Sequence, residues 1–364
     1  MMSEREQLQR AVRNGETISN RSIGALALEQ CDLSGGIFEN VVFDGTRLSQ
    51  ARFAESIFNE CVFTNVDLHG ADLSKSVFIN GALIRSDLSG SLLDECRLNG
   101  TCASGTRFSD MRARGFVCLH TDLQACRFDG AQIDRGFFDE TPLRGADFSQ
   151  TRLQRCFFYR LDLRDVAFAR TGFDRVVFTE SNLGGQHLSG QTFVRCQFVA
   201  VDLSGADLTS ASLANCNFQG ARLEHVVLEH AQASSAIFFD ADVSHARCGH
   251  ARLDNSIWVD ARVRHTDFSD ADLCGAVFQR ADAAGARFVR ARLSAADFSY
   301  AELAGADFHE AAFARTAFHG AKAAEPANHP GRPGVIDHEP ALAAAQEWSK
   351  HRDARRRTFP KEQS

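Results

Sequence analysis

The 364-residue sequence lacks any apolar run long enough to cross a membrane, and its amino end lacks the pattern of a signal peptide. It also lacks a P-loop, a nucleophile elbow, a zinc-binding helix motif and a dinucleotide fingerprint. We therefore expect a soluble cytoplasmic protein that is not an enzyme. It should have no cofactor, no small-molecule substrate and no membrane partner.

Lysine is scarce as well, because only Lys75 lies before position 321. This scarcity removes most of the chemistry in which a lysine acts as nucleophile. The eleven cysteines form no C-x-x-C pair, so the sequence does not support a zinc ribbon or a thioredoxin-like motif. The formal net charge of −7 is mild for a chain of this length.

What the sequence does contain is a five-residue unit whose third member is large and apolar. This third member falls at residues 18, 23, 28 and onward to 318, with no insertion or deletion along the way. A period of five fits neither the 3.6 residues of a helical turn nor the two residues of a strand. A chain with this period must turn a corner in every unit, and such repeats indicate a solenoid.

The units resemble those of the pentapeptide-repeat family. The tandem A-(D/N)-L-x-x pattern occurs, for example, at Ala71-Asp72-Leu73, Ala146-Asp147-Phe148, Ala206-Asp207-Leu208, Ala271-Asp272-Leu273 and Ala306-Asp307-Phe308. The resemblance implies an all-β fold, a right-handed quadrilateral β-helix with four units per coil. The length of the repeat region then predicts about 15 coils, and the residues before and after it predict short terminal helices. Members of the family have several functions, so the function has to be argued from the surfaces of this chain.

The prediction of four units per coil can be tested independently of the family resemblance, by comparing positions twenty residues apart. If twenty residues make one turn, such positions stack, and side chains of one kind can gather on one side. Phenylalanine does gather on one such ladder, whereas a neighbouring ladder is mainly leucine. The predicted core ladder consists of Phe38, Phe58, Phe78, Phe138, Phe158, Phe178, Phe198, Phe218, Phe238, Trp258, Phe278, Phe298 and Phe318.

The extent of the five-residue repeat divides the chain into four parts. Residues 1–17 are predicted to form a capping helix, in which Ser3 and Glu6 have capping-box spacing. Residues 18–320 should form the β-helix, and residues 321–339, rich in Pro and Gly, a linker. Residues 340–364 are predicted as a basic carboxyl-terminal helix and tail, more typical of a solvated helix end than of a nucleic-acid contact.

Some interior positions depart from the pattern. Nine of the eleven cysteines point inward, where we expect reduced thiols as small fillers, although Cys196 and Cys216 would stack within disulfide reach. Gln186 and Gln191 each place an amide at an inward position, so each must find a hydrogen-bond partner or distort the wall. Within residues 101–118 the central residues shrink where their partners grow, which predicts an intact coil of altered shape.

Outward positions suggest where a partner binds. Three faces are polar, but the face outside the phenylalanine ladder carries apolar residues on both flanks of the ladder, a surface that is usually covered by another polypeptide. The predicted partner is another protein or a second copy of this chain, with the carboxyl-terminal segment as an internal alternative. The predicted apolar strip consists of Ile57, Val77, Ile79, Val117, Leu119, Phe137, Phe157, Tyr159, Val177, Val199, Ile237, Phe239, Ile257 and Val259.

The sequence therefore favours a non-enzymatic, rigid scaffold for protein interaction. One alternative comes from the resemblance, because some members of the family protect DNA gyrase by mimicking DNA. Acidic and basic residues alternate along an outward column here, which argues against that alternative and against nucleic acid as a partner. The column contains Arg47, Asp67, Asp87, Arg107, Arg127 and Asp147, and later Arg247, Asp267, Arg287 and Asp307. Similar proteins are also associated with bacterial secretion machinery, a further alternative. His225, His245 and His265 stack on one corner and are weak candidates for metal binding.

Overall fold

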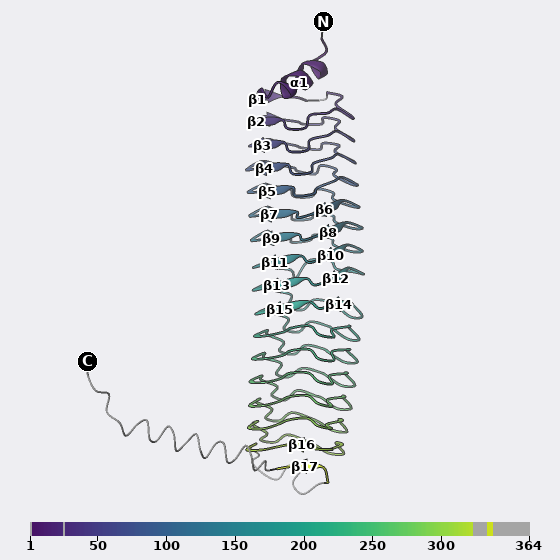
Figure 1. Ribbon diagram of the computed structural model, residues 1–364, viewed down its shortest axis with the longest axis vertical. Helices are drawn as coiled ribbons and strands as arrows, with labels where there is room; N and C mark the ends of the chain where they lie inside the picture. Colours follow the sequence, from purple (N-terminus) through teal and green to yellow (C-terminus); the bar gives the residue numbers. More distant parts are fainter. Residues whose placement is uncertain (1, 25, 323–332, 338–364) are drawn as a thin grey trace, which may run out of the picture.

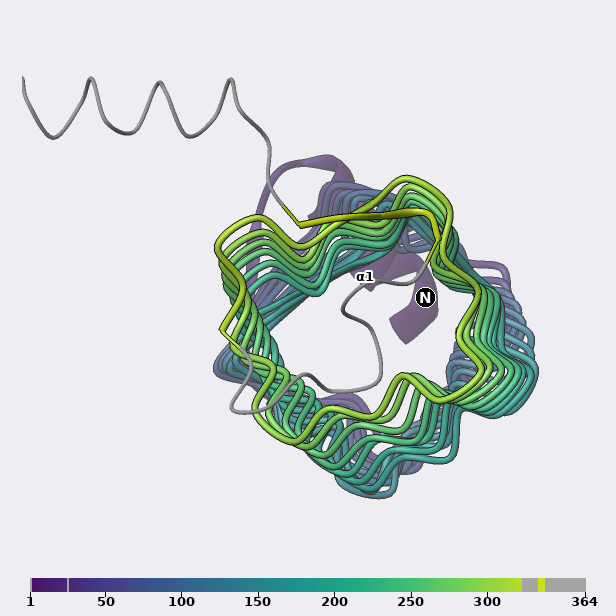
Figure 2. The same ribbon diagram turned by 90° about the horizontal axis from the view of Figure 1, so that it is seen from below.

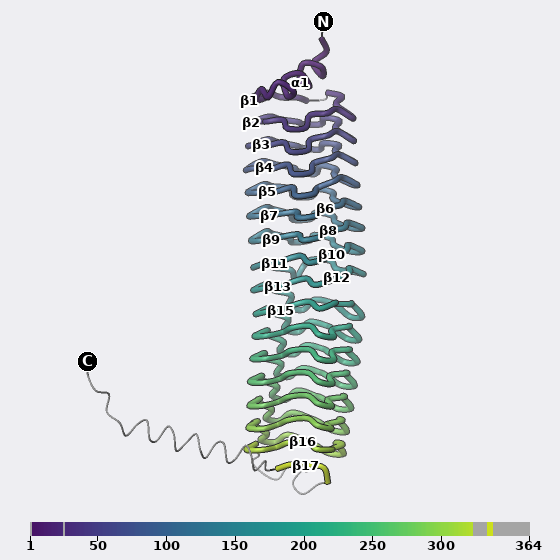
Figure 3. The backbone as a smooth tube through the Cα atoms, in the orientation of Figure 1, coloured from purple at the N-terminus to yellow at the C-terminus, as the bar shows by residue number. Residues whose placement is uncertain are grey.

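The coils stack along one axis to form a rod. The structure, a computed structural model, describes residues 2–24, 26–322 and 333–337. This part of the chain is a parallel β-solenoid of about 15 turns with one short helix at the amino-terminal end (Figure 1). The tube in Figure 3 shows successive coils lying directly on one another, and the end-on view in Figure 2 shows them superposed as one ring.

Two sheets lie in the amino-terminal two thirds of the rod, the first over residues 17–199 and the second over residues 112–194. The first has ten strands in the order β1-β2-β3-β4-β5-β7-β9-β11-β13-β15, and the second has five in the order β14-β12-β10-β8-β6. The first sheet comprises β1 (Thr17–Ser22), β2 (Ile37–Val42), β3 (Ile57–Asn59), β4 (Val77–Ile79), β5 (Arg97–Asn99), β7 (Val117–Leu119), β9 (Phe137–Asp139), β11 (Phe157–Tyr159), β13 (Val177–Thr179) and β15 (Gln197–Val199). The second comprises β6 (Arg112–Arg114), β8 (Gln132–Asp134), β10 (Arg152–Gln154), β12 (Gly172–Asp174) and β14 (Phe193–Val194).

The register of both sheets is twenty residues. Phe58 pairs with Phe78 in a parallel ladder, and beyond β15 the same offset continues as single bridges, such as Ile237 with Ile257. The backbone N–H of Leu28 donates to the carbonyl of Arg47 in the next coil at 2.9 Å. The coil of four five-residue units that the sequence predicts is therefore confirmed.

The corners explain why a five-residue unit can repeat. Among the described residues, every fifth position from Gly15 to Gly320 has a positive φ, except Asp165. These corner residues are glycine or residues without a branched Cβ, such as asparagine, arginine and histidine, which suits the left-handed region. Each unit is thus a short extended segment ended by one left-handed residue.

The aspartate that precedes many central residues stabilises the turn that follows it. The carboxylate of Asp207, for example, accepts a hydrogen bond from the backbone N–H of Thr209 at 2.9 Å. Hydrogen bonds from Thr209 lower the pKa of Asp207 below its usual value. This local bond accounts for the Asp or Asn in the repeat, because such side chains favour turns of this kind.

The core is a narrow column of stacked rings. All thirteen residues of the core ladder are buried. Phe198 lies between Phe178 and Phe218, with ring centroids 5.1 and 4.9 Å away and nearly parallel planes. Trp258 occupies one step of the ladder, and its indole N–H donates to the buried Ser256 hydroxyl at 2.7 Å, so its polar atom is satisfied.

The coil that spans residues 101–118 is intact, as predicted. Ala113 pairs with Ile133 in the second sheet, and Cys118 pairs with Phe138 in the first. Met111 and Phe116 are fully buried and compensate for these small central residues.

Gln186 both finds partners and coincides with a distortion. Its side-chain amide donates to the carbonyls of Leu163, Arg164 and Val166 at 2.6, 3.0 and 2.9 Å. Asp165, which lies between Arg164 and Val166 in the chain, is the corner residue that lacks a positive φ. Gln191 makes a single bond of this kind, to the carbonyl of Phe168 at 2.9 Å.

The two ends of the rod differ. At the amino end, α1 (Glu4–Arg13) begins with a capping box formed by Ser3 and Glu6, and its Leu8 and Val12 are buried in the core. At the other end, β17 (Val335–Ile336) pairs with β16 (Thr316–Ala317). This short strand lies inside the predicted irregular linker and supplies acceptors for N–H groups that the last coil would leave unpaired.

Residues 323–332 and 338–339 of the predicted linker lie outside the described residues. The whole of the predicted helix and tail 340–364 lies outside them as well. The domain boundaries at residues 17, 320 and 339 therefore stay predictions.

Replacing one ring of the core ladder should destabilise the rod. We expect Phe198→Ala to lower the free energy of unfolding by about 3–5 kcal/mol, because it removes a buried ring from between two others and leaves a cavity. Urea denaturation followed by circular dichroism measures the loss. Gln197→Ala changes an exposed neighbour on the same strand and should have little effect, so equal losses in the two variants would contradict the stacking argument.

The cysteines give a second test, because all eleven are free thiols and nine are buried. Burial raises the pKa of Cys96, Cys126 and Cys156 to about 12. At pH 8 only about one thiol in 10⁴ of these is then the reactive thiolate. We expect iodoacetamide to modify Cys102 and Cys274, which are only partly buried, well before the others. Peptide mass spectrometry with and without urea measures this order, and early modification of Cys126 would contradict it.

Candidate interaction surfaces

The apolar strip lies on the outside of the ten-stranded sheet and of the bridges that continue it. Ile57, Phe157, Phe239 and Ile257 are exposed, with Phe157 at 46% and Ile57 at 40%, and the other ten residues of the strip are half-buried. They flank the core ladder because successive side chains of a strand point to opposite faces. The structure therefore places all fourteen residues on one side of the rod.

Polar residues divide this strip into three segments. Arg97 and Asn99 occupy its two columns on β5, and Gln197 and Asn217 interrupt it after β13. The middle segment, on β7 to β13, carries the largest side chains. There the rings of Phe137 and Phe157 lie 6.3 Å apart, so they form a continuous aromatic surface across two coils.

A charged rim borders the middle segment. The guanidinium of Arg160 lies 4.3 Å from the centre of the Tyr159 ring, a cation–π contact. The same side chain forms an ion pair with Glu140 at 2.9 Å. An apolar centre with a polar edge is the usual arrangement of a protein interface.

Besides Met2 and Ile336 near the ends of the described chain, two exposed apolar residues lie outside the strip and were missed by the prediction. Leu92 is 43% exposed and Val194 is 45% exposed, and both belong to the outward columns of the second sheet. The signal was present in the sequence, since each is a large apolar residue in a column made mostly of polar or small ones.

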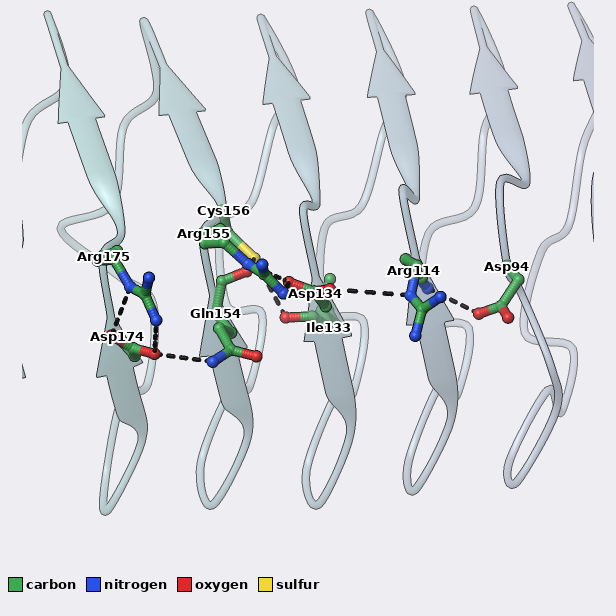
Figure 4. A network of polar contacts seen from close by, with 9 residues as sticks. All are labelled: Asp94, Arg114, Ile133, Asp134, Gln154, Arg155, Cys156, Asp174 and Arg175. Atoms are coloured by element: carbon green, nitrogen blue, oxygen red, sulfur yellow. Dashed lines mark hydrogen bonds and ion pairs between the residues drawn. The ribbon is translucent and has the colours of Figure 1, made fainter.

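The second sheet carries a polar network that the sequence analysis also missed (Figure 4). Arg155 donates two hydrogen bonds to the carboxylate of Asp134, at 2.8 and 2.7 Å. In the coils beyond, the carboxylate of Asp174 accepts from Arg175 at 3.1 Å and from the Gln154 amide at 2.8 Å. The hydrogen bond from Arg175 is the main reason why the pKa of Asp174 is lowered.

The predicted histidine stack exists on one corner. The rings of His225 and His245 lie 5.1 Å apart, and those of His245 and His265 lie 5.2 Å apart. A second stack joins His230 and His250 at 5.0 Å. Within the described ranges, however, no three His, Cys, Asp or Glu side chains are grouped so that they could hold a metal ion.

Comparison with known families agrees with the geometry. The profile described as pentapeptide repeat region matches residues 27–108, and the profile described as pentapeptide repeats (8 copies) matches residues 142–179, 173–209, 211–247, 259–294 and 291–323. Together these matches cover more than half of the chain. The chain belongs to the pentapeptide-repeat family.

Several solved structures of pentapeptide-repeat proteins are similar to this chain. AT2G44920, from the thylakoid lumen of Arabidopsis thaliana, is 27% identical, with 27% of this chain and 68% of that chain covered and a TM-score of 0.27. HetL, involved in heterocyst differentiation regulation in the cyanobacterium Nostoc, is 20% identical over 87% of this chain and 98% of HetL, with a TM-score of 0.17. Full-length QnrB1, a plasmid-mediated fluoroquinolone resistance protein, is 14% identical over 92% of this chain and 99% of QnrB1, with a TM-score of 0.24.

No curated protein matches the chain. In the part of the chain that the structure describes, no helix has the length and apolar character needed to span a bilayer.

Proposed function

We propose that this pentapeptide-repeat protein is a non-enzymatic scaffold that binds another polypeptide along its apolar strip. The observation that carries the proposal is the placement of fourteen apolar side chains on one side of a rod whose other outward columns are mostly charged or polar. An apolar surface of this length is costly to leave in water, and such surfaces usually mark contacts with other proteins.

The strip has enough apolar area for a stable contact. A dozen large side chains contribute about 1 kcal/mol or more each when a partner covers them. Phe157 and Phe239 supply the largest share, because they are the exposed aromatic side chains of the strip, and aromatic side chains bury the most area and anchor most interfaces.

Rigidity of the strip adds to affinity. Its residues on β3 to β15 belong to a continuous ladder of backbone hydrogen bonds, so their positions are fixed before a partner arrives. Little conformational entropy is then lost on binding. The partner is another protein or a second copy of this chain, and both would meet the same preorganised surface.

Mimicry of DNA is supported less well by the surface charges. Along the outward column considered above, Arg107 pairs with Asp87 at 2.9 Å and Arg287 pairs with Asp267 at 3.5 Å. These pairs neutralise carboxylates that a phosphate mimic would need as an unbroken negative run. We therefore expect no change in gyrase supercoiling activity at high concentrations of this protein, and concentration-dependent protection or inhibition would favour the alternative.

Charging the strip should weaken association. We expect the double variant Phe157→Asp with Phe239→Asp to weaken binding about tenfold or more, because two carboxylates would have to be buried without partners. Sedimentation velocity over a concentration series measures self-association. Fluorescence of an apolar dye measures the exposure of the apolar strip when no partner is present.

Val194→Asp is the matched control, because Val194 is as exposed as Phe157 but lies on the other sheet. It should leave both measurements unchanged. A wild-type protein that stays monomeric and binds no apolar dye would contradict the proposal, and dye binding only after removal of residues 321–364 would identify the carboxyl-terminal segment as the cover.

A further inference from the structure

A shallow groove of about 410 Å³ lies on the outside of the second sheet, over β6, β8 and β10. It runs along the rod, since its lining comes from equivalent positions of successive coils. Arg112, Arg114 and Arg152 line it together with Gln132. The groove lies over the coil where the central residue shrinks to Ala113, which also belongs to its lining.

One column of this groove carries positive charge with no acidic partner. Arg112 and Arg152 each pair in register with Gln132, which lies between them. Among the described residues, the side chains of Arg112 and Arg152 form no ion pair, although Arg114 and Arg155 beside them do. The guanidinium groups of Arg112 and Arg152 are therefore left for a ligand.

The same column is neutralised elsewhere in the rod. Seven coils further on, Arg252 and Arg292 occupy the equivalent positions, again two coils apart. There Asp272 lies between them, and it pairs with Arg292 at 3.0 Å, while Arg252 pairs with Asp254 at 3.1 Å. The two sites thus differ at the two positions that supply these acidic partners, because Gln132 stands where the other site has Asp272 and Arg114 stands where it has Asp254.

The acidic residues of the groove are already engaged. Asp94 accepts a hydrogen bond from the backbone N–H of Arg114 at 2.8 Å. Asp134 accepts the two bonds from Arg155 and also lies 3.9 Å from Arg114. The groove therefore has a surplus of positive charge on a chain whose formal net charge is −7.

We propose that this groove binds an acidic polypeptide segment in an extended conformation, with one carboxylate on Arg112 and another on Arg152. Guanidinium groups suit carboxylates because they can donate two parallel hydrogen bonds. The two arginines are two coils apart, roughly 9.6 Å. In a polyproline II segment, side chains three residues apart lie on the same side and about 9.3 Å apart. The preferred ligand thus carries Asp or Glu at every third position, with Gln132 available for its backbone.

The charges favour a polypeptide over a nucleic acid. Asp94 and Asp134 line the same groove, so a strand with a phosphate at every nucleotide would meet carboxylates as well as arginines. A peptide can place neutral residues opposite them. The groove lies on a different sheet from the apolar strip, so this site is independent of the proposed function.

Fluorescence anisotropy with the full-length protein tests the proposal. The probes are a labelled peptide with Glu at every third position and Pro or Ala between, a peptide of the same composition with adjacent glutamates, the Gln analogue, and oligothymidylate. We expect the first to bind most tightly, with an affinity that falls as salt increases.

Three variants assign the binding to the groove. R112Q/R152Q should weaken binding of the first peptide about tenfold or more, and Q132E should do the same by supplying an internal carboxylate like that of Asp272. R252Q/R292Q changes the charge equally at the neutralised site and should stay within about twofold of the wild type. Circular dichroism checks that each variant is folded.

Three results would overturn the proposal. They are no binding of the acidic peptides by the wild-type protein, equal losses in the two double variants, and tighter binding of oligothymidylate that R112Q/R152Q abolishes. The last result would assign the groove to nucleic acid instead.

Discussion

The hydrogen bonds between successive coils are the constraint on which the rest of the structure depends. Most bonded N–H groups point along the rod to the coil beside them, whereas others, such as that of Ala51 with the carbonyl of Leu48, close a turn within a coil. The bonds between coils fix almost every residue beside the residue twenty positions away. A side chain therefore has two neighbours of known identity, one in the coil on either side. Side chains of one kind can therefore form columns that run along the rod. Inside the rod these columns are stacked rings, and outside it they are rows of charged or apolar side chains.

The corners make this ladder possible, and they also restrict the sequence. A positive φ at the corner residues excludes side chains that are branched at Cβ, but it permits arginine, histidine and asparagine, which point into water. The two histidine stacks are a product of this rule. They form because corner residues of successive coils lie close together, whether or not they have a function.

Surface chemistry in such a rod is decided by a few residues. At the site of Arg252 and Arg292 each arginine has an acidic partner, Asp254 or Asp272, whereas the equivalent Arg112 and Arg152 have none among the described residues. The apolar strip behaves in the same way, since four polar residues divide it, namely Arg97, Asn99, Gln197 and Asn217. In a globular protein the neighbours of such residues come from unrelated parts of the chain, but here they are set by the register.

The sequence by itself determined the period, the coil, the core ladder and the outward columns, because all of these depend only on a register of twenty residues that never slips. Tertiary structure decided the rest. Arg252 pairs within its own coil and Arg292 pairs with a neighbouring coil, and Gln186 reaches three carbonyls around the irregular corner at Asp165. Long side chains have several partners within reach, so the identities of a column's residues do not fix which contacts form. The free arginines of the groove depend on which of these contacts form, so only the folded chain reveals the groove.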